Sequence, residues 1–546
     1  MRRYAPWFIL LFVAYLFLLF YGIDYPVWNK DEGLYADTVR EMIERGNYLD
    51  PYFNYEHRWQ KPILIYWVLL PFATFFDPSG WSLRLGLIVI GLLTLVVSYL
   101  LAKKLFKNSE IAFFSAFFLL SSVAFLIQSR HIVTHLLLLF TIMLAFYFMW
   151  DLLSGRRERW RILLFGAALG LVFLAKLYVG MVFVLTTGFL LGIWEIWQHK
   201  LSFLKGLIWG IFAFSVVALP WYIYMIFQYG DQYTVYVYHE FFDRITQSVT
   251  GKNGPFFYIG VYFGNYAPWS IPLVGMGVVA LWRHKSNLWR SLTQNMPLLF
   301  ALTGFFVVFF TLSIPKSKLP GYLFSLQGFA AILTAYGFYH LDWSRWIKWL
   351  FYALQTVLSL ATVIIWIRYF DPKSLKFALI VAAILGSFLW PMTDKYRAVL
   401  RLGVVNFLLL FSIAGQLQKE IAPYFPYERY GKTIVKLNET KCLPVYSYNS
   451  RRESMPFYAQ TKINPVSKLP SGVNEYILLI DEQDFNRVKQ NLSYYKIVDR
   501  SLYYKGSDSQ VFKIINMQKG YRPPKDEGVW LLVLVGRRNQ EVLSNP

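Results

Sequence analysis

Residues 81–107 read WSLRLGLIVIGLLTLVVSYLLAKKLFK, an apolar run that contains one arginine, Arg84, and ends in Lys103, Lys104 and Lys107. A helix needs about 20 mostly apolar residues to cross the hydrocarbon core of a bilayer, and this run is long enough. Lysines that follow such a run are typical of the cytoplasmic side of a membrane. The stretch therefore predicts a transmembrane helix whose C-terminal end faces the cytoplasm.

Comparable runs fill most of the 546-residue chain, in which 56% of the residues are hydrophobic and only 16% are charged. This composition is too apolar for one soluble core. We expect a polytopic α-helical membrane protein with about thirteen spans. The candidate spans are 7–23, 81–102, 110–128, 132–153, 161–176, 177–197, 204–228, 256–282, 296–314, 320–339, 345–367, 374–393 and 398–417.

The loops between these runs orient the chain. If the N-terminus lies inside, every inner loop is basic, as the positive-inside rule requires. The formal net charge of +22 therefore reflects membrane orientation, and we expect no nucleic-acid partner. The inner loops carry Lys103, Lys104, Lys107, Arg156, Arg157, Arg159, Arg161, Lys200, Lys205, Arg283, Lys285, Arg290, Arg345, Lys348, Lys395, Arg397 and Arg401.

Two apolar segments need separate interpretation. The N-terminal run to about Ile23 follows Arg2 and Arg3 but has no small-residue cleavage site, so we interpret it as a retained anchor. Segment 62–76 begins at Pro62 and contains Pro71. If it crossed the membrane, most later basic loops would move outside, so we expect it to lie along or dip into the outer interface. An odd number of crossings then places the C-terminus outside.

From about Pro423 the composition becomes that of a soluble protein, so we divide the chain into a transmembrane catalytic domain, 1–422, and a small extracytoplasmic α/β domain, 423–546. Strand-like runs occur at 445–448, 476–480, 511–515 and 530–534. The only cysteine, Cys442, excludes an intrachain disulfide and a cysteine zinc site.

Unusual polar residues gather on the outer side. The first outer loop, 24–61, contains the acidic pair Asp31 and Glu32 at the start of an amphipathic stretch. Such a pair also complements a helix dipole, so by itself it proves little. The other outer segments, including the long loop 229–255, add Arg130, His135, Lys176, Glu240, Arg244, Lys316, Lys318 and Tyr322.

The outer basic residues contradict the rule that orients the chain. Lys176 lies between two apolar runs and is costly there unless it is paired or faces water. Each residue alone could extend to lipid headgroups, but the whole set favours a shared anionic ligand. A lipid phosphate fits, because its negative charge grows when a bond to it breaks. Four outer histidines, His57, His131, His135 and His239, give no firm ligand set, so a divalent metal is an alternative that we do not favour.

The first outer loop resembles the signature of the GT-C glycosyltransferases related to lipid A aminoarabinose transferases and protein O-mannosyltransferases. The matching stretches are Asp31-Glu-Gly-Leu-Tyr-Ala36, Arg40-Glu-Met42, Gly46-Asn-Tyr48, Pro51 and Lys61-Pro-Ile-Leu-Ile-Tyr-Trp67, followed by Leu219-Pro-Trp-Tyr222, His239-Glu-Phe-Phe-Asp-Arg244, Gly254-Pro255, Ala267-Pro-Trp-Ser270, Ser313, Lys316-Ser-Lys-Leu-Pro320 and Tyr322.

The resemblance implies inverting transfer of a sugar from a polyprenyl phosphate to lipid A, core oligosaccharide or another envelope acceptor. Asp31 would be the essential carboxylate, as general base or acceptor-positioning group. Phosphate oxygens would be bound by Lys61, Arg130, Lys176, Lys318 and Tyr322, while Glu240 and Arg244 would form the cavity wall. We also count Glu32, Tyr35, Arg58, Gln60, His135 and Lys316 as substrate-binding candidates.

The chain departs from the family pattern at three places. Gln60 and His135 stand where relatives often have carboxylates, and Leu177-Tyr178 stands where Gly-Pro commonly follows the lysine. Fewer carboxylates argue against a cationic aminoarabinose donor and favour a neutral or acidic sugar, such as a uronic acid. Two alternatives remain: a protein O-mannosyltransferase-like enzyme acting on Ser or Thr, and a lipid-linked-sugar flippase. We expect a monomer in a bacterial or archaeal cytoplasmic membrane, with its active site outside.

Overall fold

The computed structural model describes residues 2–198, 200–246, 253–254, 256–284, 288–315, 318–417, 422–450, 452–504 and 527–536. Contacts divide the chain into two compact units. We call them the helical unit, which comprises residues 1–21, 59–68 and 84–412, and the sheet unit, which comprises residues 22–58, 69–83 and 413–546.

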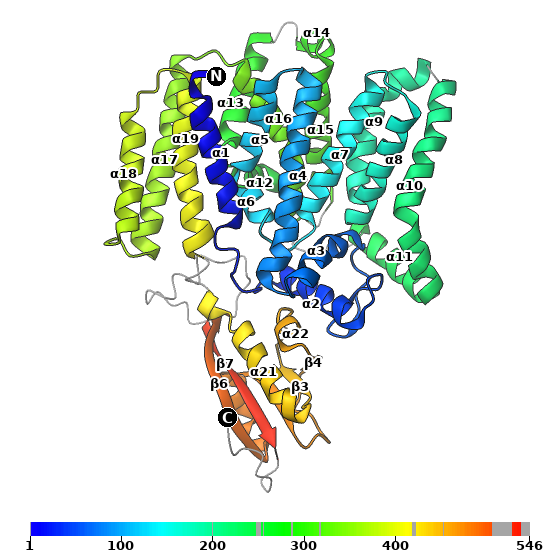
Figure 1. The fold of residues 1–546 in the computed structure, drawn as a ribbon, viewed down its shortest axis with the longest axis vertical. Coiled ribbons are helices and arrows are strands. Elements are labelled where there is room, and N and C mark those ends of the chain that lie inside the picture. The colour runs from blue at the N-terminus through cyan, green and yellow to red at the C-terminus, as the bar shows by residue number, and fades with distance from the viewer. Residues whose placement is uncertain are drawn as a thin grey trace. The chain divides into compact units, whose positions relative to one another are not determined.

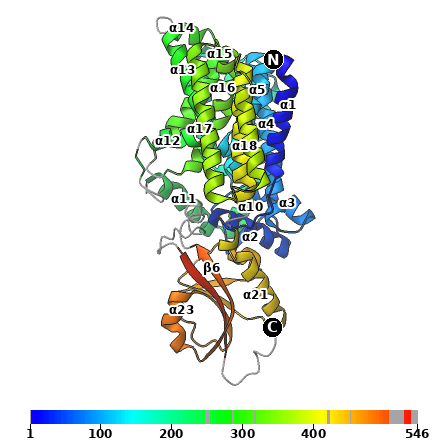
Figure 2. The same cartoon turned by 90° about the vertical axis from the view of Figure 1, so that its left-hand side faces the viewer.

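Long apolar helices form the helical unit, and Figures 1 and 2 show them packed side by side as a bundle. Their bounds are α1 (Ala5–Phe20), α4 (Gly80–Phe106), α5 (Ser109–Leu120), α6 (Val123–Gln128), α7 (His135–Leu153), α8 (Arg159–Lys176), α9 (Tyr178–Gln198), α10 (Lys200–Tyr229), α11 (Asp231–Thr246), α12 (Phe257–Asn265), α13 (Ser270–His284), α14 (Leu288–Thr293), α15 (Met296–Ser313), η2 (Pro320–Leu326), α16 (Gln327–Tyr339), α17 (Arg345–Tyr369), α18 (Leu375–Leu389) and α19 (Lys395–Phe411). A further helix, α3 (Leu64–Phe75), contains Pro71 and corresponds to segment 62–76.

Each of the expected apolar runs is helical. Among the described residues, seven helices are long and apolar enough to cross a membrane by length and composition. They are Arg2–Phe20, Gly80–Phe106, His135–Leu153, Gly206–Tyr229, Met296–Ser313, Arg345–Arg368 and Lys395–Ala414. Shorter apolar helices, such as Tyr178–Ile193 and Leu375–Leu389, account for several of the other runs. The polytopic helical fold is thus confirmed, while the figure of about thirteen crossings stays a prediction.

Two expected spans, 110–128 and 256–282, are each broken into two helices, and the breaks contact each other. The backbone N–H of Val123 donates to the Ala267 carbonyl at 3.1 Å, and the Trp269 indole donates to the Ser121 hydroxyl at 2.9 Å. The Asn406 amide donates to the Ser121 carbonyl at 2.8 Å. A helix break leaves backbone groups without helical partners, and such groups must be satisfied inside an apolar bundle. These contacts supply the partners.

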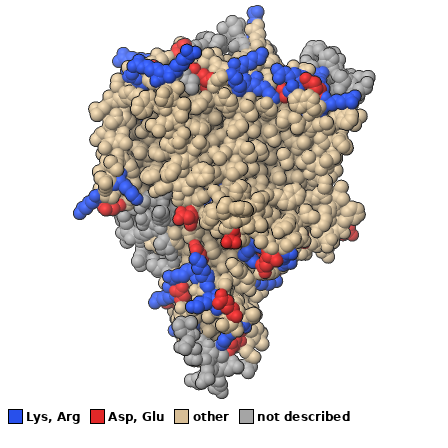
Figure 3. Space-filling model, viewed as in Figure 1, with Lys and Arg blue, Asp and Glu red and all other residues tan. Residues whose placement is uncertain are grey.

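The basic loops assigned to the inner side meet at one end of the helical unit. Asp151, which is buried, accepts from Lys104 at 2.8 Å and from Arg161 at 2.7 Å. The Tyr4 hydroxyl donates to Asp394 at 2.6 Å, which ties the N-terminus to the loop before α19. Figure 3 shows Lys and Arg concentrated along this end, beside a broad surface almost free of charge. The loops therefore share one face, as the charge pattern predicts.

The sheet unit contains a five-stranded sheet in the order β4-β3-β5-β7-β6. Its elements are α21 (Tyr427–Lys441), β3 (Val445–Tyr448), α22 (Met455–Ala459), β4 (Ile463–Val466), β5 (Tyr476–Asp481), α23 (Glu482–Val488), β6 (Tyr494–Tyr504) and β7 (Glu527–Gly536). Strand β3 runs parallel to β4 and β5, whereas β7 is antiparallel to β5 and β6. Every residue of β5 is buried, and Leu478, Ile480, Leu531 and Val533 lie in its core.

The expected α/β domain is confirmed, with differences in its strands. β3, β5 and β7 match the runs at 445–448, 476–480 and 530–534, and the run at 511–515 lies outside the described residues. β4 and β6 were not expected: β4 contains Pro465, which suits only an edge strand, and β6 carries Lys496, Asp499 and Arg500.

Most of the first outer loop, residues 24–58, also lies within the sheet unit. It forms α2 (Lys30–Arg45) and a short hairpin of β1 (Tyr52–Phe53) and β2 (Glu56–His57). Protein segments in direct contact cannot lie on opposite sides of a bilayer. The contact between the first loop and the C-terminal domain therefore requires both on one side of a membrane, and the side itself stays a prediction.

Candidate functional site

The N-terminus of α2 presents Asp31. Asn29 caps the helix by accepting a hydrogen bond from the Asp31 backbone N–H at 2.8 Å. Asp31 itself is exposed, whereas Glu32 and Tyr35 are buried. The Asp31 carboxylate is therefore accessible to a substrate, and Glu32 belongs to the packed side of the helix.

Arg58 and Tyr35 lie together, as their shared assignment to the site predicts. The Arg58 guanidinium lies over the Tyr35 ring, 4.5 Å from its centroid, and donates to the Thr38 hydroxyl at 3.3 Å. Arg58 is almost fully buried. In this structure it packs against α2 and fixes the segment that returns from the hairpin.

A charged cluster on α2 was not expected from the sequence. Arg40 forms an ion pair with Asp37 at 2.8 Å, while Asp37 and Glu41 accept hydrogen bonds from the backbone N–H groups of Asn54 and Tyr55 at 2.9 and 2.8 Å. Burial, followed by the neighbouring Asp37 charge, raises the pKa of Glu41 to about 7. Burial also raises the pKa of Asp37, against the opposing effect of Arg40. The sequence did contain a signal for this cluster: charged residues recur three or four positions apart along the helix, at Asp37, Arg40, Glu41 and Glu44.

In the helical unit, three residues from separate helices form a second cluster. Lys176 ends α8, His135 begins α7, and Tyr322 lies in η2. The Lys176 ammonium is 3.3 Å from His135 Nδ1 and 4.3 Å from the centroid of the Tyr322 ring. Lys61 and His131 are close enough to act electrostatically on His135. The structure thus brings together four of the residues predicted to bind substrate: Lys61, His135, Lys176 and Tyr322.

The contacts of this cluster indicate which nitrogen of the His135 imidazole carries the proton and how closely the ring is packed. A charged lysine ammonium donates, so the tautomer that suits this contact is the one with Nδ1 as acceptor and the proton on Nε2. A Cβ atom on Gly321 would lie 2.7 Å from Nε2, so only glycine fits beside the ring. The cluster therefore offers two donors, the ammonium and the imidazole N–H.

The residue after Lys176 is backbone-strained. Leu177 has φ +53° and ψ −137°, a conformation that leucine rarely adopts. Glycine is the residue that the family commonly has there, and it adopts such a conformation without strain. The Lys176–Leu177 junction between α8 and α9 thus has a backbone shape that suits glycine, although leucine occupies it.

Two other predicted phosphate ligands are held by backbone carbonyls. Arg130 is buried and donates to the Tyr21 carbonyl at 2.7 Å, while Arg84 donates to the Arg130 carbonyl at 3.1 Å. The Lys318 ammonium donates to the carbonyls of Pro315 at 2.7 Å and Asn253 at 3.4 Å. A phosphate role for Arg130 and Lys318 stays a prediction.

The remaining predicted site residues differ in how far the structure describes them. Gln60 is exposed, and Glu240 and Arg244 belong to α11, although their side chains are not described. Lys316 lies outside the described residues. Among the residues that are described, no three His, Cys, Asp or Glu side chains gather so as to hold a metal ion.

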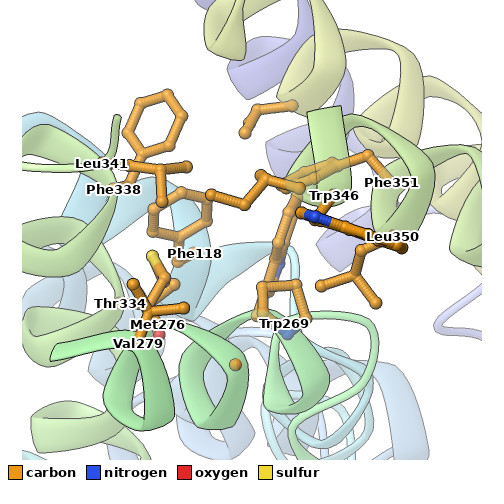
Figure 4. Close-up of a pocket in the computed structure, with 14 residues that line it drawn as sticks. Phe118, Trp269, Met276, Val279, Thr334, Phe338, Leu341, Trp346, Leu350 and Phe351 are labelled. Atoms are coloured by element: carbon orange, nitrogen blue, oxygen red, sulfur yellow. The ribbon is translucent and has the colours of Figure 1, made fainter. Parts of the chain in front are cut away.

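A cavity of about 170 Å³ also lies in the helical unit, between α5, α13, α16, α17 and α19 (Figure 4). Its lining is apolar except for Thr334, whose hydroxyl donates to the Ala330 carbonyl at 2.7 Å. No charged side chain lines it, so it does not suit a phosphate. The cluster around Lys176 is the better candidate.

Comparisons with known proteins show what the chain as a whole is similar to. The model of the dolichyl-phosphate-mannose-protein mannosyltransferase family matches residues 7–236. An uncharacterised protein of Aquifex aeolicus is 27% identical over 461 residues, which cover 84% of this chain and 87% of that protein. Undecaprenyl phosphate-alpha-4-amino-4-deoxy-L-arabinose arabinosyl transferases of Proteus mirabilis and Erwinia tasmaniensis are 25% and 27% identical. Each match covers 59% of this chain and 58% or 59% of the transferase, less than two thirds of its length.

The fold is similar to that of a solved structure, ArnT from Cupriavidus metallidurans bound to undecaprenyl phosphate. The TM-score is 0.73 at 18% identity, over 96% of this chain and 98% of that one. This likeness confirms the helical membrane fold with its small C-terminal domain. The matched family and the named relatives indicate a glycosyltransferase, and the chain resembles the GT-C glycosyltransferases related to aminoarabinose transferases and protein O-mannosyltransferases, as its motifs predict.

Proposed function

We propose that the chain is an inverting glycosyltransferase that moves a sugar from a polyprenyl-phosphate donor to lipid A, core oligosaccharide or another envelope acceptor, outside the cytoplasm. The observation that carries this proposal is the cluster of Lys176, His135 and Tyr322. A lysine at the end of an apolar helix is costly, and an anionic lipid headgroup would offset that cost.

In the proposed reaction, an acceptor hydroxyl oxygen attacks the anomeric carbon of the sugar. The bond from that carbon to the phosphate oxygen breaks, and its electron pair stays on the phosphate. Polyprenyl phosphate therefore leaves with one more negative charge than it carried in the donor, and Asp31 takes the acceptor proton. Cations that bind this growing charge stabilise the transition state more than the ground state.

His135 also bears on the charge of the sugar that the donor carries. A carboxylate at this position would repel a phosphate, whereas a neutral imidazole donates its Nε2–H to one. With Gln60 as a second uncharged replacement, the site lacks two anions that would favour a cationic sugar. We therefore propose a neutral or acidic sugar as the donor's glycosyl group.

The family match over residues 7–236 favours one alternative acceptor, the Ser or Thr hydroxyl of a protein. The chemistry at the donor would be the same, so the two acceptors are separated by supplying each to the purified protein. A flippase would bind the lipid phosphate but release no sugar from it.

The function is tested with protein in nanodiscs, polyprenyl-phosphate sugars and lipid A or peptide acceptors, by measuring the release of polyprenyl phosphate. Asp31→Asn should lower turnover about 100-fold, the loss expected for a general base. Lys176→Met keeps the aliphatic stem and should lower turnover at least tenfold, since about 1.4 kcal/mol of lost transition-state binding is a tenfold effect.

Matched controls are Asp371→Asn, at an exposed turn, and Lys103→Met, whose ammonium binds the Ser109 hydroxyl. Both should keep wild-type turnover. If Lys176→Met changes the melting temperature but not turnover, Lys176 serves only as a membrane anchor.

A further inference from the structure

The C-terminal domain contacts α2, the helix that carries Asp31, directly near its N-terminus and indirectly through the β1–β2 hairpin. We propose that the C-terminal domain is a positioning element for Asp31, which it fixes by gripping α2 at its N-terminus and through the β1–β2 hairpin. This inference rests on the proposed function for its effect on turnover, although the grip itself can be measured without any reaction.

The first contact is at the N-terminal end of α2. A Cβ atom on Gly33 would lie 2.6 Å from the Glu453 carbonyl carbon, the Ser454 backbone nitrogen and the Ser454 hydroxyl. The helix therefore approaches the backbone of the C-terminal domain as closely as only glycine allows. The Ser454 hydroxyl also donates to the carbonyl of Asn29, the residue that caps Asp31, at 3.3 Å.

Neighbouring contacts hold the same end. Lys30 forms an ion pair with Glu453 at 3.3 Å, and the Val27 backbone N–H donates to the Tyr458 hydroxyl at 2.5 Å. Residues on both sides of the N-cap are thus attached to the start of α22. Asp31 lies within this attached segment.

The second contact is made by the hairpin. The Asn54 side chain donates to the Ile463 carbonyl at 2.9 Å and accepts from the Ile463 N–H at 2.8 Å, so it pairs with the start of β4 as a strand would. The Tyr55 hydroxyl donates to the Gln460 carbonyl at 3.2 Å. These two turn residues both have positive φ, +53° and +62°.

The hairpin transmits this contact to α2. Asp37 and Glu41 accept from the backbone N–H groups of Asn54 and Tyr55, and Arg40 pairs with Asp37. α2 is therefore attached to the C-terminal domain directly near Gly33 and indirectly through the hairpin. A helix held at two places resists tilting and rotation. Precision matters for catalysis, because a misplacement of about 1 Å can cost about 100-fold in rate.

The decisive variant is Asn54→Gly. Glycine tolerates the positive φ of the turn, so the change deletes the two hydrogen bonds to Ile463 without straining the backbone. Asn449→Gly is the matched control: Asn449 also has positive φ, +47°, but its side chain binds only within the C-terminal domain, to Asp484. Gly33→Ala tests the other contact, with Gly277→Ala, where a Cβ meets nothing within 4 Å, as its control.

Two measurements are made on each purified full-length variant: hydrogen–deuterium exchange of residues 30–45, and turnover with polyprenyl-phosphate sugar. We expect Asn54→Gly to speed exchange in α2 and to lower kcat at least tenfold, with little change in the KM for the donor. Gly33→Ala should act in the same direction, while both controls match the wild type.

The inference is overturned if α2 exchanges in Asn54→Gly as it does in Asn449→Gly, or if exchange rises while kcat stays at the wild-type value. Equal losses in kcat, donor binding and melting temperature would mean general destabilisation and would also overturn it. If the wild type itself releases no polyprenyl phosphate, the proposed function fails, and the exchange data alone then decide whether the grip exists.

Discussion

Leu177 holds a backbone shape that suits glycine, directly after the lysine at the centre of the proposed phosphate site. Strained residues of this kind cost about 1–3 kcal/mol and persist where the surroundings impose them. Here α8 ends and α9 begins within two residues, so the chain must turn abruptly at Leu177. The turn places Lys176 beside His135, so we interpret the strain as the cost of that placement.

Leu177→Gly should therefore be more stable than Leu177→Ala by about 1 kcal/mol, because alanine keeps the strained φ and glycine removes it. Both variants lose the leucine side chain, so that loss cancels in the comparison. Thermal unfolding of the two proteins in the same detergent measures the difference. Equal melting temperatures would show that no strain is stored at this position.

Helix α2 and its hairpin are joined by a carboxyl group that changes charge near neutral pH. The pKa of Glu41 is raised from an ordinary value of 4.5 to about 7, so the folded protein binds more protons than the unfolded chain between these values. Stability contributed by this group is present below about pH 4.5 and is lost as the pH rises to about 7. Burial and the Asp37 charge raise the pKa of the carboxyl, whereas the Tyr55 N–H, Arg40 and Arg45 lower it.

Glu41→Gln cannot ionise but keeps an oxygen that accepts from the Tyr55 N–H. Relative to the wild type, its melting temperature should rise steadily between pH 5 and pH 8. Titrating groups that do not interact with Glu41 are common to both proteins and cancel in the difference. A difference that does not depend on pH would mean that Glu41 has an ordinary pKa.

At the level of helices and strands, the sequence predicted correctly those elements that depend on a local pattern of residues. Length and apolarity placed a helix at every expected run. The breaks after Leu120 and Asn265 were not predicted, because they depend on contacts between Ser121, Trp269 and Asn406, which are far apart in the sequence. β4 was missed because its alternation is interrupted by Pro465, and its pairing is completed by Asn54, 409 residues from Ile463.

The site shows the same difference between features that follow from the sequence pattern and contacts between residues that are far apart in the sequence. The excess of outer cations predicted a shared anionic ligand, because isolated charges beside apolar helices need a shared cause. The family resemblance then named Lys61, Arg130, Lys176, Lys318 and Tyr322 as its phosphate ligands. The carbonyl contacts of Lys318 could not be predicted, since they depend on the path of a loop. The attachment of α2 to the C-terminal domain was also unforeseen, because Gly33 and Ser454 show no local sign of their proximity.

The charges of the loops orient the whole chain in the membrane. Two groups of contacts in the structure indicate which segments lie on the same side of the membrane. In the helical unit Asp151 binds Lys104 and Arg161, and in the sheet unit α2 binds the C-terminal domain. The positive-inside rule places the first group in the cytoplasm. Cys442, exposed in the C-terminal domain, should then lie outside.

This orientation is tested in intact cells with a maleimide that does not cross membranes. The wild type has a single cysteine, so labelling of Cys442 from outside reports the C-terminal domain directly. In a Cys442→Ser background, Ser154→Cys places the reporter at an exposed position beside Asp151 and should be labelled only after the cells are opened. If Cys442 is instead labelled only in opened cells while Ser154→Cys remains inside, an even number of segments crosses between residues 154 and 442, and one of the nine spans expected there is wrong. If both reporters exchange sides, the later basic loops lie outside, as a crossing of segment 62–76 would place them, and the outward positions proposed for Lys176 and for the C-terminal domain would be wrong.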